Sequence, residues 1–89
     1  MNHIIKRKGH RESFDERKVY ASCYAACLNA HRPKERAEEI CGNVAASVRK
    51  WIHDRAEVDS DTLFRKITEV LTMHDADAAF LYETHRDIS

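Results

Sequence analysis

The chain has 89 residues, of which 43% are hydrophobic and 34% are charged, and this length fits one domain. Fifteen basic residues balance fifteen acidic ones, so no overall positive charge indicates a nucleic-acid partner. Two Gly, one Pro and three Cys are too few for a turn-rich β-sandwich or a disulfide scaffold. The composition predicts one mainly helical domain over residues 1–89, in the cytoplasm, with neither a membrane span nor a signal peptide.

Two short strands are expected at the start of the chain. Residues 4–7 and 10–14 flank Lys8-Gly9, a pattern typical of a hairpin around a tight turn. An isolated hairpin is marginal in water, so these strands must pack on the rest of the domain. The segment Ala56-Glu57-Val58 is a candidate third strand.

Four helices are predicted from capping residues and hydrophobic periodicity. The first begins at Asp15, with Phe14 and Val19 placed as a hydrophobic staple around this cap. The second covers residues 33–54, with Pro33 in its first turn and an apolar stripe along its length. The third repeats the staple around Asp59, and the fourth starts near Asp75.

Cys23, Cys27 and His31 recur every four residues and therefore share one face of the first helix. A structural zinc site needs four ligands, commonly from paired cysteines on loops, and only Cys41 or scattered histidines could complete it here. Because the cysteines also lie on the apolar stripe, we interpret them as core residues and expect no metal. No spacing of Ser, His, Asp or Cys suggests catalysis, so an enzyme is not expected.

The N-terminal hairpin is unusually basic. Residues 1–18 carry six positive and three negative charges, whereas residues 57–89 carry three positive and eight negative charges. Lys and Arg groups converging near a helix start suit a polyphosphate ligand. The alternative from the residues alone is a solvated edge strand that its charges protect from aggregation.

The run from Ile4 to Val19 resembles the opening signature of the ATP-cone domain, approximately V-x-K-R-D-G-x-x-E-x-F-D-x-x-K-I. The likeness continues through Val58-Asp59-Ser60 and an aromatic fourth helix near Phe80 and Tyr82. It implies a four-helix ATP-cone-like bundle capped by a small three-stranded mixed β-sheet, made of the N-terminal hairpin and a short strand before the third helix. It also implies a regulatory module that binds ATP or dATP, with Mg²⁺ accompanying the nucleotide.

The resemblance further assigns roles to individual positions. Lys6 and Arg7 would hold phosphates, Glu12 and Phe14 would meet the adenine, and Lys18 would lie near the phosphate or the sugar. Ile4 and Val19 would form apolar walls, and Ser60 would donate its hydroxyl. Phe64 occupies a helix position near the nucleotide.

Two positions depart from the family pattern. Lys8 replaces the usual Asp before the turn glycine, and Phe64 stands where many members place His or Asp. The later basic phosphate contact has His85 and Arg86 as its candidates.

The predicted function is that of a freestanding ATP-cone-like regulatory module that signals through a homo-oligomer or an unidentified protein partner. The alternative is a helical protein-interaction adaptor that keeps the cone fold without nucleotide binding. A third hypothesis, nucleic-acid binding through the hairpin, is disfavoured by the zero net charge and by the lack of an aromatic platform on the hairpin.

Overall fold

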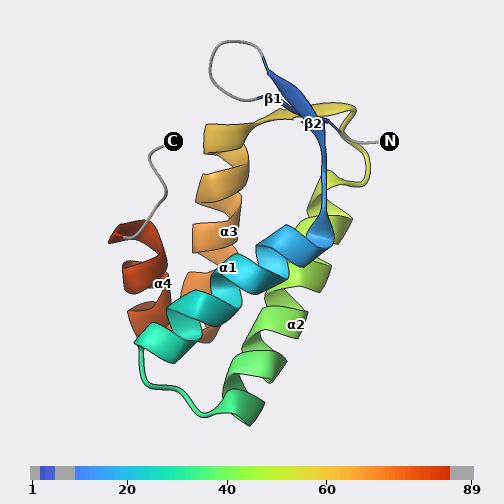
Figure 1. Cartoon of the computed structure of the whole chain (residues 1–89). Helices are drawn as coiled ribbons and strands as arrows, with labels where there is room; N and C mark the ends of the chain where they lie inside the picture. The colour runs from blue at the N-terminus through green and yellow to red at the C-terminus, as the bar shows by residue number, and fades with distance from the viewer. Residues whose placement is uncertain (1–2, 6–9, 85–89) are drawn as a thin grey trace.

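The computed structural model describes residues 3–5 and 10–84, and within them four helices lie below a small β-sheet (Figure 1). The elements in chain order are β1 (His3–Ile5), β2 (Arg11–Ser13), α1 (Glu16–Asn29), α2 (Lys34–Ile52), β3 (Glu57–Asp59), α3 (Ser60–His74) and α4 (Ala76–Thr84). The prediction of a mainly helical domain with four helices is confirmed. Within the described residues, none of the helices has both the length and the hydrophobicity needed to cross a membrane.

The three strands pair in the order β2-β1-β3. β1 runs antiparallel to β2 and parallel to β3, so Ile4 lies opposite Glu12 on one side and Val58 on the other. Each strand has three residues, too few to be stable without packing on another layer. The predicted turn around Lys8-Gly9 lies outside the described residues.

The predicted caps start α1 and α3. The Asp15 carboxylate accepts a hydrogen bond from the backbone N–H of Arg17 at 2.9 Å, and Asp59 accepts one from Asp61 at 2.7 Å. Pro33 differs from its prediction, because it is the N-cap residue of α2 and not part of the first turn. Its backbone is extended there, with ψ at 155°.

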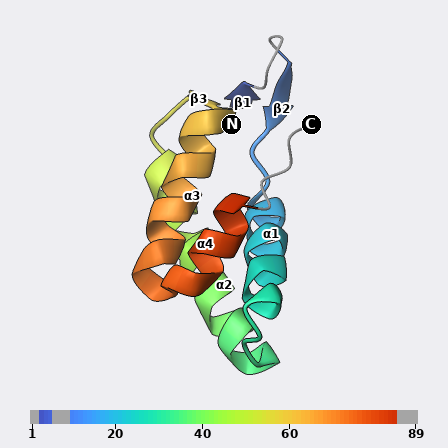
Figure 2. The same cartoon turned by 90° about the vertical axis from the view of Figure 1, so that its left-hand side faces the viewer.

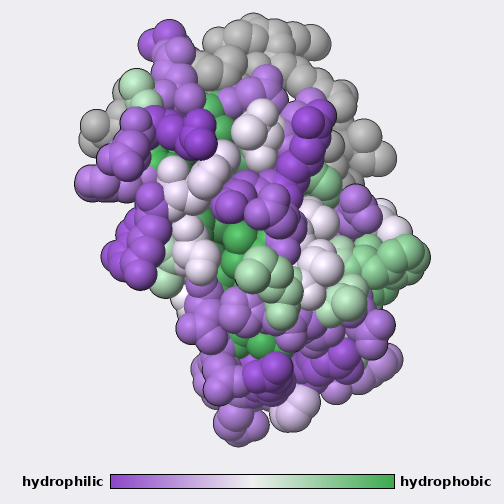
Figure 3. Space-filling view, turned by 180° about the vertical axis from the view of Figure 1, so that it is seen from behind, coloured by the Kyte–Doolittle hydropathy of each residue, from purple (hydrophilic) through white to green (hydrophobic). Residues whose placement is uncertain are grey.

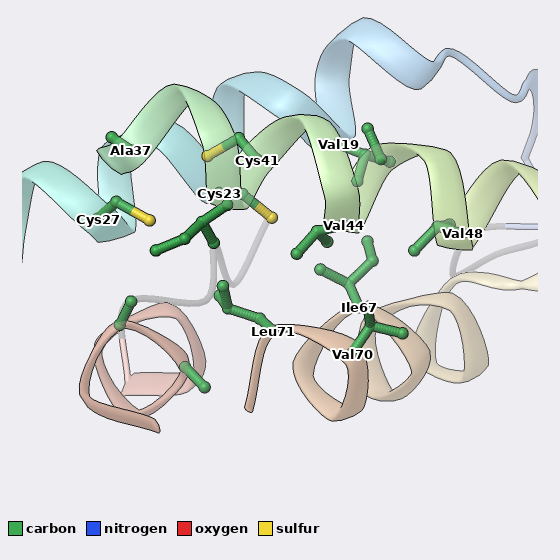
Figure 4. Packing of buried hydrophobic residues seen from close by; sticks show 14 of the residues in the cluster. Val19, Cys23, Cys27, Ala37, Cys41, Val44, Val48, Ile67, Val70 and Leu71 are labelled. Carbon is green, nitrogen blue, oxygen red and sulfur yellow. The ribbon is translucent and has the colours of Figure 1, made fainter. Parts of the chain in front are cut away.

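Buried hydrophobic side chains form two clusters. The helix cluster lies among the four helices, and Figure 4 shows its valines, Ile67 and Leu71 packed together with three cysteines. The sheet cluster consists of Ile4, Ile52 and Val58, and it lies between the sheet, the last turn of α2 and the first turn of α3. Phe14 and Leu63 pack against both clusters and thereby join the sheet to the bundle.

A tight turn ends α1. His31 has φ at 62°, in the left-handed region, and its N–H donates to the Leu28 carbonyl at 2.9 Å. The Arg32 N–H donates to the Cys27 carbonyl at 3.0 Å. These two hydrogen bonds form a Schellman motif, in which glycine is the residue that helices normally place at the left-handed position.

Asp75 alone forms the corner between α3 and α4. Its N–H donates to the Leu71 carbonyl at 2.8 Å, and its carboxylate accepts a hydrogen bond from the Ala78 N–H at 3.1 Å. Arg32 reaches the same carboxylate with Nε at 2.6 Å and Nη2 at 3.0 Å. The hydrogen bonds from Arg32 lower the pKa of Asp75, against the opposing effect of burial.

We predict that His31→Gly stabilises the domain by about 0.5–1 kcal/mol, because glycine adopts the left-handed conformation without the steric cost of a Cβ atom. Urea unfolding of the two proteins measures the difference. A destabilised His31→Gly variant would show that the imidazole makes a compensating contact in the folded protein.

We also predict that Asp75→Asn destabilises the domain in a pH-dependent way. Asn keeps the cap but loses the charge that pairs with Arg32. Folding lowers the pKa of Asp75 below its ordinary value of 3.8. The extra stability of the wild type over Asp75→Asn is therefore fully present above pH 3.8, and it is lost as the pH falls through the lower pKa of the folded protein. Unfolding curves from neutral pH to acid give this difference. The same substitution at Asp77, whose side chain is 83% exposed, should have the smaller effect.

Candidate functional site

The starts of α1 and α3 and the ends of α2 and α4 lie on the sheet side of the bundle. Figure 2 shows the first turns of α1 and α3 and the last turn of α4 on the side of the bundle that faces the strands. The first turn of a helix carries a partial positive charge and unpaired N–H groups, which favour an anion. The chain therefore brings two positive helix ends to the edge of the sheet, where most of the predicted site residues lie.

Glu12 and Lys18 form the polar part of this region. Glu12 is the register partner of Ile4, so both side chains project from the same face of the sheet, toward the helices. Lys18, one turn into α1, places Nζ 3.7 Å from the Glu12 Oε1 atom. The Glu12 side chain is 38% exposed and that of Lys18 is 70% exposed, so solvent reaches both charges.

Three predicted apolar residues support this region from behind. Ile4 and Val19 are each 4% exposed, in the sheet cluster and the helix cluster respectively. Ile4 lies opposite Glu12 in the strand ladder and Val19 follows Lys18 in sequence, so both buried side chains lie in the core behind this pair. Phe14 is half-buried at the junction of the clusters, two residues after Glu12 in sequence.

Ser60 and Phe64 lie one turn apart at the start of α3. Ser60 follows Asp59, which pairs with Ile5 in the sheet, so the hydroxyl lies at the end of the parallel ladder. The Phe64 ring stacks on Tyr82 of α4, with 5.2 Å between ring centroids and 17° between ring planes. Sequence reasoning assigned no site role to Tyr82. In the sequence, Tyr82 is visible only as part of the aromatic pattern of α4, and such a pattern does not reveal which residue of another helix it contacts.

Arg11 is the basic residue of the hairpin that the structure describes. Arg11 on β2 forms a salt bridge with Glu57 on β3, on the face of the sheet opposite Glu12. Its charge is therefore directed away from the helix ends. Lys6 and Arg7, the two predicted phosphate ligands, lie outside the described residues, as do His85 and Arg86.

Comparison with protein families gives a match to the ATP cone domain over residues 2–88. The chain belongs to the ATP-cone family. ATP-cone domains are nucleotide-binding regulatory modules. No curated protein matches the sequence.

The cysteines of this ATP-cone domain lie in the helix cluster. Cys23, Cys27 and Cys41 are free thiols without solvent exposure (Figure 4). Burial raises the pKa of Cys23 to about 12 and also raises the pKa values of the other two. A metal ion binds the thiolate, which these surroundings disfavour. His31 is exposed, and across residues 3–5 and 10–84 no three His, Cys, Asp or Glu side chains cluster as metal ligands would.

We predict that the three thiols react with an alkylating reagent at least about a hundredfold more slowly in the native protein than in denaturant, because reaction requires opening of the core. Mass spectrometry of timed samples measures the labelling. Protein purified without added zinc should also contain only substoichiometric zinc. Rapid labelling of one thiol, or stoichiometric zinc that a chelator removes with unfolding, would contradict the assignment of the cysteines to the core.

Proposed function

We propose that this ATP-cone domain binds ATP or dATP between the sheet and the starts of α1 and α3, without catalysing a reaction. The observation that carries the proposal is the Glu12–Lys18 pair. This pair combines the Glu12 carboxylate, which faces the helices, with the solvent-accessible ammonium group of Lys18 in the first turn of α1. A ligand with a hydrogen-bond donor at one end and negative charge at the other end matches both groups.

The Glu12 carboxylate suits adenine. Adenine carries an exocyclic amino group, which donates hydrogen bonds, whereas guanine has a carbonyl acceptor at the same ring position. We propose that position 6 of the purine faces Glu12, because guanine in the same orientation would place its carbonyl oxygen against a carboxylate, which only accepts hydrogen bonds. In this orientation the site would favour ATP and dATP over GTP, with the half-buried Phe14 ring, two residues further along the chain, as an apolar contact for the base.

The phosphate end of the ligand suits the cations and the helix starts. Lys18 would supply one charge, and Lys6 and Arg7 are proposed to supply two more from the hairpin. The helix ends of α1 and α3 add partial positive charge, and Mg²⁺ would neutralise phosphate oxygens that these groups do not reach.

The proposed setting is the cytoplasm, where unpaired thiols such as those of this domain stay reduced.

We predict that Lys6→Ala and Lys18→Ala each weaken ATP binding by about tenfold, the usual effect of losing one charge-assisted hydrogen bond. Calorimetric titration with ATP, dATP and GTP in magnesium buffer measures the affinities. Lys34→Ala is the matched control, because it also removes a lysine charge, but one that is exposed at the opposite end of the bundle.

Two outcomes separate nucleotide binding from the alternative. Unchanged affinity in Lys6→Ala and Lys18→Ala would place the nucleotide elsewhere on the domain. A wild-type protein that binds neither ATP nor dATP at millimolar concentration would favour the adaptor that keeps the cone fold and lacks the ligand.

We propose that the bound nucleotide signals by changing self-association or the binding of a partner protein. Two large hydrophobic side chains lie exposed where α3 and α4 meet solvent: Met73 is 79% exposed and Phe80 is 63% exposed. On the face that Figure 3 shows, the surface is mostly hydrophilic with smaller hydrophobic patches. Phe80 lies on the same short helix as Tyr82, so a ligand beside Tyr82 can change how Phe80 is presented to a second copy.

We predict that ATP or dATP shifts self-association by roughly 1–3 kcal/mol of coupling free energy, and that Phe80→Ser abolishes the shift. Sedimentation velocity with and without each nucleotide is the measurement. Leu28→Ser is the control, because Leu28 is also exposed, at 46%, but lies on α1. Identical sedimentation in all conditions, despite proven binding, would contradict signalling through self-association.

A further inference from the structure

Helix α4 depends on contacts with the rest of the domain. It has nine residues, fewer than an isolated helix needs to be stable in water. Its buried side chains are those of Ala78 and Ala79, which are small, while Leu81 and Tyr82 pack on the helix cluster only partly buried. Because apolar stabilisation scales with buried area, α4 is held less firmly than α2, whose apolar stripe is longer.

The polar contact at the start of α4 compensates for this thin packing. The Asp75 carboxylate, 7% exposed, accepts hydrogen bonds from Arg32 and from the Ala78 N–H. Arg32 also donates to the Ala30 carbonyl at 2.8 Å and to the Asp77 carboxylate at 3.2 Å. One guanidinium group thus ties the turn after α1 to the first turn of α4.

The geometry of this contact is specific to arginine. Nε and Nη2 donate side by side to the two oxygens of one carboxylate, while Nη1 donates to a backbone carbonyl. Lysine has a single nitrogen and cannot make the parallel pair. The contact therefore fixes the direction in which α4 leaves the corner at Asp75, and not only its proximity to α1.

At the other end of α4, Tyr82 stacks on Phe64. Phe64 lies one turn after Ser60, at the start of α3 and beside the proposed nucleotide site. A rotation of α4 about the corner at Asp75 would move Tyr82 away from Phe64. The stack, and the aromatic wall that it gives to the site, consequently depends on the salt bridge at the far end of the same helix.

We propose that Arg32 is a positioning residue for the nucleotide site: its bidentate contact with Asp75 holds α4 so that Tyr82 stacks on Phe64, and nucleotide affinity depends on this contact. The inference rests on the proposed function. It assigns to Arg32 an effect on a ligand that it does not touch, carried by a short helix with two anchored ends.

Arg32→Gln is the direct test, with Arg36→Gln as its matched control. Arg36 forms an exposed ion pair with Glu39 within α2, so its charge is paired on its own helix and not with α4. Two measurements are made on each protein: amide hydrogen exchange across α4 compared with α2, and calorimetric titration with ATP. We expect Arg32→Gln to accelerate exchange in residues 76–84 at least about tenfold while α2 stays protected, and to weaken ATP binding about fivefold or more. Arg36→Gln should change neither.

Arg32→Lys distinguishes positioning from simple charge. It retains the positive charge but not the parallel hydrogen bonds, so its exchange and affinity should fall between those of the wild type and Arg32→Gln. If Arg32→Gln does not fold, Asp75→Asn replaces it, since Asn preserves the cap of α4.

The proposal is overturned if α4 exchanges at the wild-type rate in Arg32→Gln. It is also overturned if α4 is released but ATP affinity is unchanged, or if α2 loses protection together with α4. Failure of the proposed function gives a different result, because the wild type then binds no ATP while the exchange measurement still reports whether Arg32 holds α4.

Discussion

The contact of Phe14 with both hydrophobic clusters is the constraint on which the rest of the structure depends. The strands have three residues each, and their ladders cannot stabilise a sheet without a packed face. Ile4 and Val58 provide that face against Ile52, and Phe14 with Leu63 connects it to the helix cluster. Without this junction the sheet would have no fixed position over the helices, and Glu12 would have no fixed distance from Lys18.

The two ends of the domain have different physical characters. At the sheet end, accessible charges lie over helix starts, which suits a ligand that exchanges with solvent. At the opposite end, the partly buried Arg32 and the Asp75 carboxylate join the turn after α1 to the corner between α3 and α4. Helix α4 spans the space between these ends, with Asp75 before its first residue and Tyr82 in its last turn. A small domain can in this way link a ligand to a distant surface without a second domain.

Local features of the sequence were sufficient to predict the helices. Asp15 and Asp59 cap helices through atoms within two residues of themselves, so their roles can be inferred without knowing the fold. The Arg32–Asp75 contact could not be inferred, because 43 residues separate its partners and the sequence marks Asp75 only as the start of the fourth helix. The same holds for Phe64 with Tyr82. The place of Arg11 on the outer face, next to Glu57, could not be inferred either, because only the register of the sheet determines it.

Nucleotide binding below the sheet is the central claim, and a nitrogen-15 NMR titration of the labelled protein with ATP and GTP tests it residue by residue. The account predicts that ATP shifts the amide signals of Glu12, Lys18, Ser60 and Phe64 most strongly, and that GTP at the same concentration shifts them less. Signals near Lys34, at the opposite end of the bundle, should remain in place. Unchanged spectra with ATP, or the largest shifts around Lys34, would contradict the account.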